Sequence, residues 1–184
     1  MGKRRIFRLW MKWEQLFHFL YKVKPIDEEH PLLQIRLRTY KGQPLLLNDG
    51  EELRRGDRIF ELHFDNETLA ALAAGSKSTV HLAIHLIRGT EQLLPQLADR
   101  IRTQADYQDI KALYGISHIY RGTEKLGFTV IEMQRGIFRF LTTHYLRLLL
   151  SVIHPEGKKR VTANTELIVP KIIAFSSKKL LEKY

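Results

Sequence analysis

One run of alternating residues, followed by two turn signals, constrains the fold of this chain more than any other feature. In the segment LQIRLRTY at 33–40, apolar and polar residues alternate, which is typical of a half-buried strand. Turn-forming triplets follow at 48–50 (NDG) and 55–57 (RGD), and the Asp-Gly pair supplies the positive φ of a type I′ turn. Apolar segments at 45–47 and 58–64 adjoin these turns, so we expect a β-meander over 33–64.

Helical periodicity dominates much of the remaining chain. Asp65 or Asn66 is placed to cap an Ala- and Leu-rich helix. Helical spacing then continues over 79–104 as one helix or two, with Gly89 and Pro95 as candidate break points. A further helix is expected over 137–153, where apolar residues recur at intervals of three and four.

The other segments complete an α+β pattern. Residues 112–119 fit a strand or a helix, and 124–127 (EKLG) indicate the end of a short helix that runs into a strand at 128–133. Residues 167–175 resemble a strand, and the serine pair at 176–177 caps a short closing helix. We therefore expect a single compact α+β domain over 25–184, with a mixed sheet and packed helices, preceded by an amphipathic helix over 1–24.

The composition fits one folded domain that needs no metal or covalent crosslink. A chain of 184 residues, 44% hydrophobic, can bury about 70% of its unfolded surface. The absence of cysteine excludes thiolate catalysis, cysteine-ligated zinc, iron–sulfur clusters and disulfides. No P-loop, Rossmann glycine fingerprint, G-x-S-x-G or H-E-x-x-H occurs, so the sequence predicts no cofactor and no metal.

The first 24 residues have the pattern of a basic amphipathic helix. Both tryptophans lie on one broad apolar arc, and most of the basic residues lie opposite. Such a helix can lie in a membrane interface, because indole rings sit at headgroup level and cationic side chains attract anionic lipid. The predicted membrane-contact residues are Arg4, Arg5, Arg8, Trp10, Lys12, Trp13 and Phe17. The alternative, in which the tryptophan face packs on the domain, stays open.

The net charge of +10 is concentrated at the two ends of the chain. Residues 1–24 hold seven basic residues and one acidic residue, and 157–184 hold seven and two, whereas 25–156 are nearly balanced. Folds that grip nucleic acid more often spread basic residues along a groove with interleaved aromatics. We therefore expect an anionic membrane surface or envelope polymer machinery as the partner, rather than nucleic acid.

Neither a secretory signal nor a membrane span is predicted. Charged residues and a histidine interrupt the N-terminal apolar stretch, and the apolar segment at 138–153 is too short to cross a bilayer. The expected location is the cytoplasm, with peripheral attachment at the inner membrane.

Several blocks of the sequence resemble a known family. The segments LLQIRLRTYKGQPLLLNDGEELRRGDRIFELHFDNETLAAL, IKALYGISHIYRGTEKLGFTVIEM, HYLRLLLSVIHPEGKKR and SSKKLLEKY are similar to the YkoP-type bacterial family, from about residue 6 to the end. That family also occurs as a tail on polysaccharide deacetylase-like chains. The resemblance implies a bacterial cell-envelope context and supplies no catalytic residues, and the deacetylase portion with its metal ligands is missing here.

Two groups of residues are candidates for catalysis. Glu61, His63 and Asp65 share one face of the expected strand, and an imidazole between two carboxylates can serve as a general base. An ordinary exposed polar face, with Asp65 used as a helix cap, explains the same alternation. The second group surrounds His118 and Arg121, where a neighbouring serine does not by itself make a catalytic triad.

Three readings follow from these features. The first is an accessory or binding protein at the inner membrane surface, linked to envelope polysaccharide metabolism. The second is a small hydrolase or transferase whose pocket is lined by His63, Asp65, His118 and Arg121. It requires these residues to converge in one cleft. The third is a nucleic-acid binder through the basic termini. His81 and His85, four residues apart, could hold a metal only with a third ligand.

Overall fold

The computed structural model describes residues 23–153 and 169–184. Most of the predicted amphipathic helix over 1–24 lies outside the described residues, including every predicted membrane-contact residue. Its last residue, Lys24, belongs to the short strand β1 (Lys24–Pro25), in keeping with the extended conformation that a residue before proline prefers. This strand pairs antiparallel with β2 (Leu33–Thr39), so the chain is already extended before Pro25.

A six-stranded mixed sheet forms the centre of the described structure, in the order β1-β2-β5-β6-β8-β7. The other strands are β5 (Arg58–Phe64), β6 (Ile110–Ser117), β7 (Thr129–Glu132) and β8 (Lys171–Ser176). Neighbours are antiparallel except β5 and β6, which are parallel and therefore need a long crossover. The helices α2 (Asn66–Gly75) and α3 (Thr79–Thr103) and the 3-10 turn η1 (Ala105–Tyr107) supply it. The predicted α+β class is confirmed.

The expected meander over 33–64 has a different strand pairing. β2 pairs directly with β5, from Leu33 opposite Phe64 to Thr39 opposite Arg58, while β3 (Leu45–Leu46) and β4 (Glu52–Leu53) form a separate hairpin. β2 and β5 have 7 residues each, so their pairing forms more backbone hydrogen bonds than pairing with the two-residue strands β3 or β4 would. The Gly50 N–H donates to the Leu47 carbonyl, and the Leu47 N–H donates to the Glu51 carbonyl, so residues 48–50 form a three-residue connection. Gly50, with a φ of 84°, is its last residue. This connection replaces the predicted two-residue type I′ turn.

The segment 79–103 forms one continuous helix, α3, and neither candidate break point interrupts it. Pro95 removes one intrahelical hydrogen bond and ordinarily kinks or ends a helix. Here the flanking apolar residues Leu93, Leu94 and Leu97 are buried in the core, and this burial holds the helix against the sheet on both sides of the proline.

Side-chain caps define where the helices begin. The Asp65 carboxylate accepts a hydrogen bond from Thr68 N–H at 2.7 Å, and the Ser176 hydroxyl accepts one from Lys179 N–H at 3.0 Å. Asp65, not Asn66, is therefore the cap of α2, and Ser176 is the cap of α7 (Ser177–Lys183). The ambiguous segment after residue 110 is strand β6, and α4 (Thr123–Leu126) leads into β7 as expected.

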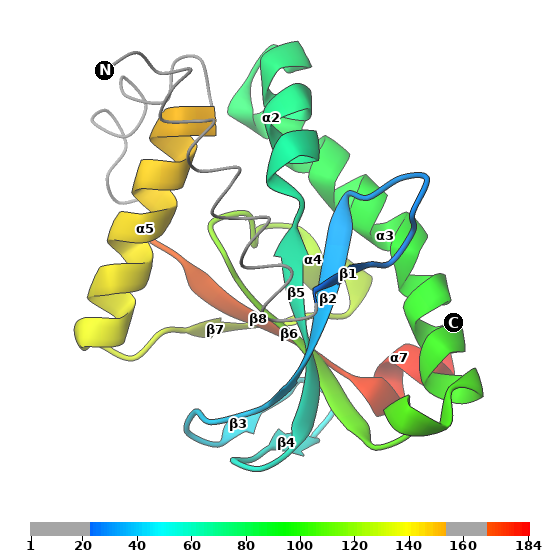
Figure 1. The fold of residues 1–184 in the computed structure, drawn as a ribbon. Helices are drawn as coiled ribbons and strands as arrows, with labels where there is room; N and C mark the ends of the chain where they lie inside the picture. Colours follow the sequence, from blue (N-terminus) through cyan, green and yellow to red (C-terminus); the bar gives the residue numbers. More distant parts are fainter. Residues whose placement is uncertain (1–22, 154–168) are drawn as a thin grey trace.

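The sheet separates two unlike layers. Figure 1 shows α3 and α7 on one side of the strands and α5 (Ile137–Ile153) on the other. The α3 side is a continuous apolar core built from Phe60, Leu113 and Phe175 of the sheet and Leu94 and Leu97 of α3. On the α5 side, Leu47 and Leu53 of the hairpin segment help cover an apolar cluster on the strands. The part of that face formed by β2 and β5 is polar and carries Arg36, Arg38, Glu61 and His63.

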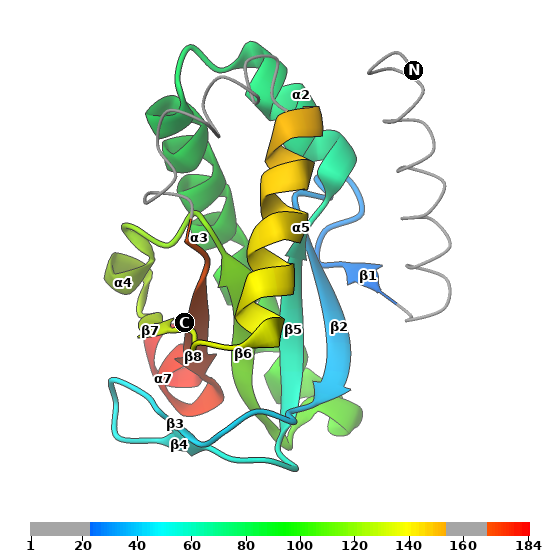
Figure 2. The same cartoon turned by 90° about the vertical axis from the view of Figure 1, so that its left-hand side faces the viewer.

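Helix α5 has its apolar face turned outward. Ile137, Phe140, Leu141, His144 and Tyr145 are exposed, whereas Arg139, Thr142, Thr143, Leu146 and Arg147 are half-buried. These two sets fall on opposite sides of a helical wheel. Figure 2 shows α5 in front of the sheet, and α5 also contacts α2, so the half-buried residues are covered by these neighbouring elements. The predicted helix over 137–153 is confirmed, but part of the apolar stripe on this helix faces solvent.

A glycine after α4 gives a direct test of the packing. Gly127 has a φ of 114°, and a Cβ placed there would lie 2.7 Å from the Phe175 ring. We expect Gly127→Ala to lower the free energy of unfolding by about 2–4 kcal/mol, since it combines backbone strain with overpacking. Gly75→Ala is the matched control, because a Cβ at Gly75 meets nothing within 4 Å. Urea denaturation compares the two variants, and equal stabilities would contradict the described packing.

Candidate functional site

The polar side chains of the sheet gather on the face directed at α5. Phe60, Leu62 and Phe64 of β5 pack against the core on the α3 side, so Glu61 and His63 lie on the opposite face, as the alternation predicts. In the ladder, Gln34 of β2 lies opposite His63 and Arg36 lies opposite Glu61. The β2 and β5 part of this face therefore carries charge, whereas its β6, β7 and β8 part carries apolar residues that include Ile116, Ile131 and Ile172.

Glu61 is a buried carboxylate with several cationic neighbours. Its side chain is 12% exposed, and its oxygens lie 2.6 Å from Arg38 Nη1 and 3.6 Å from Arg36 Nη1. Burial acts to raise the pKa of Glu61, but His63 and the two arginines outweigh it and hold the pKa below its ordinary value. Glu61 is therefore ionised at neutral pH.

His63 stands beside this carboxylate and is partly open to solvent. Its Nε2 atom lies 3.5 Å from a Glu61 oxygen, and its side chain is 33% exposed. A neighbouring acid can orient an imidazole, and general-base chemistry and anion binding both use an oriented imidazole. His63 also takes part in other interactions.

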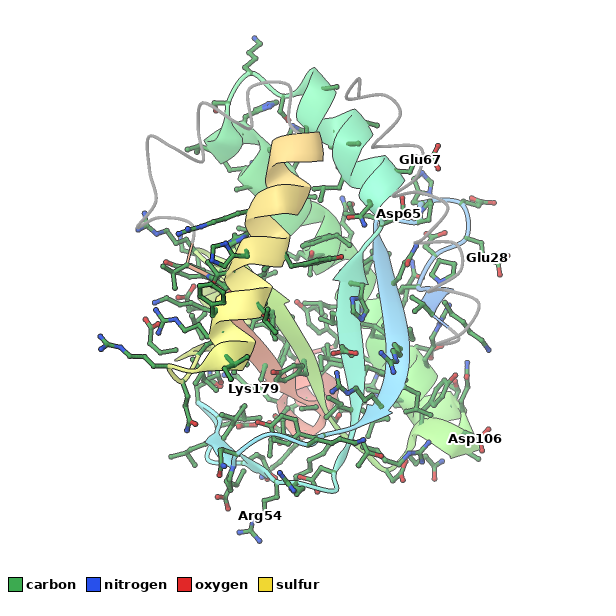
Figure 3. All side chains as sticks on the ribbon, turned by 60° about the vertical axis from the view of Figure 1, so that its left-hand side comes forward. Glu28, Arg54, Asp65, Glu67, Asp106 and Lys179 are labelled. Atoms are coloured by element: carbon green, nitrogen blue, oxygen red, sulfur yellow. The ribbon has the colours of Figure 1, made fainter. Side chains whose placement is uncertain are left out.

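Asp65 serves as the cap of α2, the competing role that the sequence analysis identified. One of its oxygens accepts from Thr68 N–H, and the other accepts from Gln34 Nε2 at 2.9 Å. Figure 3 shows Asp65 and Glu67 where β5 passes into α2. Both carboxylate oxygens of Asp65 thus hold the β5–α2 junction and the neighbouring strand.

His118 follows the end of β6 and lies on the α5 side of the sheet. Tyr114 and Ile116 pack on that face, and the strand alternation continues to His118, while Ile119 joins the cluster on the α3 side. Glu61 pairs with Tyr114 in the parallel strands, and His63 and His118 follow that pair by two and four residues on the same face. The structure thus brings these two predicted residues to the same end of the same face.

The ring nitrogens of His118 are buried, and its imidazole is electrically neutral at physiological pH. Burial, together with the nearby Arg147 guanidinium of α5, lowers its pKa from 6.5 to about 4. Neither ring nitrogen is exposed, and neither has a hydrogen-bond partner among the described residues. A buried donor or acceptor without a partner costs about 1–3 kcal/mol, so this position calls for a physical explanation.

Arg121 and Ser117 lie outside this arrangement. Arg121 is exposed and lies near Lys171, whose ammonium sits over the Tyr120 ring at 4.7 Å. The Ser117 hydroxyl accepts from Ile119 N–H at 2.9 Å and so stabilises the turn after β6. Of the four predicted pocket residues, His63 and His118 share a face, Asp65 caps a helix, and the structure shows no contact of Arg121 with them.

Sequence reasoning missed the arginines that surround Glu61 and His118. Arg36 and Arg38 occupy the polar positions of the predicted strand, but a half-buried strand ordinarily presents such positions to water. In β2 the burial is reversed beyond Ile35, because Arg36 and Arg38 are half-buried while Leu37 is exposed. Arg147 gave no sequence signal, since its importance depends on the orientation of α5.

A cavity of about 520 Å³ lies on the other side of the molecule, between the β1–β2 loop, α2 and α3. Its lining includes Asp27, Glu29, His30, His85 and Gln96, and none of the four predicted pocket residues. His81 and His85 approach each other with 3.2 Å between their Nε2 atoms. Within 23–153 and 169–184, no group of three or more histidine or acidic side chains is arranged to hold a metal ion.

The lowered pKa of His118 makes a pH-dependent contribution to stability. The unfolded chain takes up a proton near pH 6.5, whereas the folded chain resists it until about pH 4, so folding is penalised as the pH falls between these values. The penalty reaches at most about 3 kcal/mol. We expect His118→Asn to be less sensitive to acid than the native chain over this range in denaturant titrations. His85→Asn, at an exposed position, should follow the native curve, and identical curves for all three proteins would contradict this burial.

Comparison with known proteins places the chain in a family. The family model described as "YkoP domain" matches residues 3–184. The Bacillus subtilis (strain 168) protein described as "Uncharacterized protein YkoP" is 26% identical over 165 residues, covering 89% of this chain and 90% of that protein. No solved structure gives a significant match. The chain therefore belongs to the YkoP domain family.

Proposed function

We propose that this chain is a binding protein that attaches to the anionic surface of a bacterial membrane, with the outward apolar face of α5 as a contact. The observation that carries the proposal is the exposure of large apolar side chains along that face. Ile137 is 80% exposed, Phe140 61%, Leu141 59% and Tyr145 49%. Contiguous exposed apolar surface of this kind marks protein or membrane contact sites.

The pattern on α5 suits a helix that lies in a lipid interface. Apolar and aromatic side chains recur at intervals of three, four and eight residues, which forms a single stripe. Arg135 is exposed and precedes the first residue of the helix by two positions. Cationic side chains next to an apolar stripe attract anionic headgroups and allow the stripe to enter the acyl boundary.

The charge of the whole chain favours the same partner. The net charge is +10, and both ends of the sequence are basic. We also predict a second attachment segment at the start of the chain, with the membrane contacts Arg4, Arg5, Arg8, Trp10, Lys12, Trp13 and Phe17. Two weak attachments act together far more strongly than either does alone. No helix in the described part of the chain combines the length and apolarity that a membrane crossing requires.

The family resemblance supports the setting of this proposal. YkoP-type domains also occur as tails on polysaccharide deacetylase-like chains. This association suggests a role in the metabolism of envelope polymers, which are made and modified at the membrane surface. We propose that this chain contributes attachment or recognition to such machinery. This part of the proposal rests on association within the family.

Vesicle flotation tests the α5 contact with a matched control. The double variant Phe140→Ser with Leu141→Ser removes two exposed apolar side chains, so the fold should survive while binding to phosphatidylglycerol vesicles weakens by about tenfold or more. Val80→Ser with Ile84→Ser also removes two exposed apolar side chains, from α3, and should leave vesicle binding unchanged.

The same assay separates the alternatives. Trp10→Ser with Trp13→Ser examines the N-terminal prediction, and a thermal melt shows whether those changes unfold the protein instead. Equal binding by the native chain and the α5 variant would contradict the proposal. Stronger retention on DNA or RNA than on vesicles at equal ionic strength would favour the nucleic-acid reading.

A further inference from the structure

We propose that His81 and His85, one turn apart on α3, form a two-histidine binding site for a late transition metal ion of the Cu²⁺ and Zn²⁺ class. The Nε2 atoms of the two side chains are 3.2 Å apart, and both residues are exposed. The site lies in the first half of α3 and shares no residue with the apolar stripe of α5, so the inference does not depend on membrane attachment.

The separation of the two nitrogen atoms suits a chelate. Bonds of about 2.0–2.1 Å from one ion to two nitrogen atoms that are 3.2 Å apart form an angle of about 100–106° at the ion. This angle lies between the right angle of square-planar coordination, which Cu²⁺ adopts, and the tetrahedral angle, which Zn²⁺ adopts. The two imidazoles can therefore bind the same ion.

The helix fixes this spacing before an ion arrives. Residues four positions apart are neighbours on a helix surface, and Leu82 and Leu86, which directly follow the two histidines, are 4% and 0% exposed and anchor this part of α3. The two rings stand edge to face at 78°, with their centroids 4.4 Å apart. An exposed imidazole turns easily about its last side-chain bond, so both lone pairs can be directed at one ion while the backbone stays in place.

The donor atoms select the class of metal. Imidazole nitrogen suits copper, zinc and nickel, whereas Mg²⁺ and Ca²⁺ prefer oxygen ligands. Arg88 follows His85 by three residues, and the positive end of the α3 dipole is close. Coordinate bonds, and not long-range attraction, must therefore supply most of the affinity, so we expect Cu²⁺ to bind more tightly than Zn²⁺ and Mg²⁺ not to bind.

The pair lies at the edge of the cavity between the β1–β2 loop, α2 and α3. His85 lines this cavity together with Asp27 and Glu29, and the described residues of the lining include no lysine or arginine. The Glu29 N–H donates to an Asp27 oxygen at 2.9 Å and lowers the pKa of that carboxyl, which is therefore ionised at neutral pH. The cavity side of the pair thus favours the approach of a cation.

Two protein ligands leave other coordination positions of the ion open. In the described part of the chain, no third histidine or acidic side chain joins the pair in a metal-binding group. The further ligand that the sequence analysis required is then a water molecule or a small molecule from outside the chain, as at metal sites that keep an open position. Because closed structural sites have four protein ligands, we expect weaker and reversible binding here.

A hydrogen bond between the two rings explains the same distance without a metal. One neutral imidazole would donate its Nε2–H to the Nε2 atom of the other. The two explanations differ in their response to metal ions. A chelate binds an ion through both histidines at once, whereas two merely hydrogen-bonded surface histidines bind it no better than isolated ones do.

Calorimetry with copper chloride and zinc chloride tests the site on the full chain without an affinity tag. We expect His81→Gln and His85→Gln each to weaken Cu²⁺ binding by about tenfold or more, because one histidine cannot chelate. His144→Gln is the matched control, since it removes an exposed helical histidine that has no other histidine one turn away, and it should leave binding unchanged. Equal losses in all three variants, or no loss in either variant of the pair, would overturn the site.

Electron paramagnetic resonance of bound Cu²⁺ supplies a second readout. We expect two imidazole nitrogen atoms around the ion in the native chain and in His144→Gln, and at most one in His85→Gln. Thermal melts verify that each variant is folded, which the exposure of all three positions favours. A native spectrum with one nitrogen ligand or none would show an adventitious ion only and would overturn the inference.

Discussion

The unlike faces of the central sheet determine how the rest of the molecule is arranged. One face is apolar and buries the long helix α3, whereas the other carries the ionised carboxylate of Glu61 in contact with arginines of β2. A buried charge is tolerated only with charged or hydrogen-bonding partners, and Arg36, Arg38 and His63 provide them for Glu61. On helix α5, Thr142, Thr143 and Arg147 are half-buried, whereas the large apolar side chains of Phe140 and Leu141 are in contact with solvent.

Local patterns predicted most of the fold. The helix over 137–153, the caps at Asp65 and Ser176 and the α+β class follow from periodicity and capping chemistry, and the structure confirms them. The pairing of β2 with β5 could not be predicted, since alternation identifies a strand but not its neighbour. The arginine environment of the site was missed for the same reason: Arg147 becomes a neighbour of His118 only when α5 is placed over β6.

Single cysteines along α5 test the orientation of this helix most directly, and the native chain contributes no thiol of its own. Leu141→Cys and Thr142→Cys are adjacent in sequence and about 100° apart around the helix, and Leu141 is exposed whereas Thr142 is half-buried. We expect a small thiol reagent to modify the cysteine at 141 at nearly the rate of the unfolded chain, and the one at 142 at least about tenfold more slowly. Equal rates, or faster reaction at 142, would show that the polar side of α5 does not face the sheet.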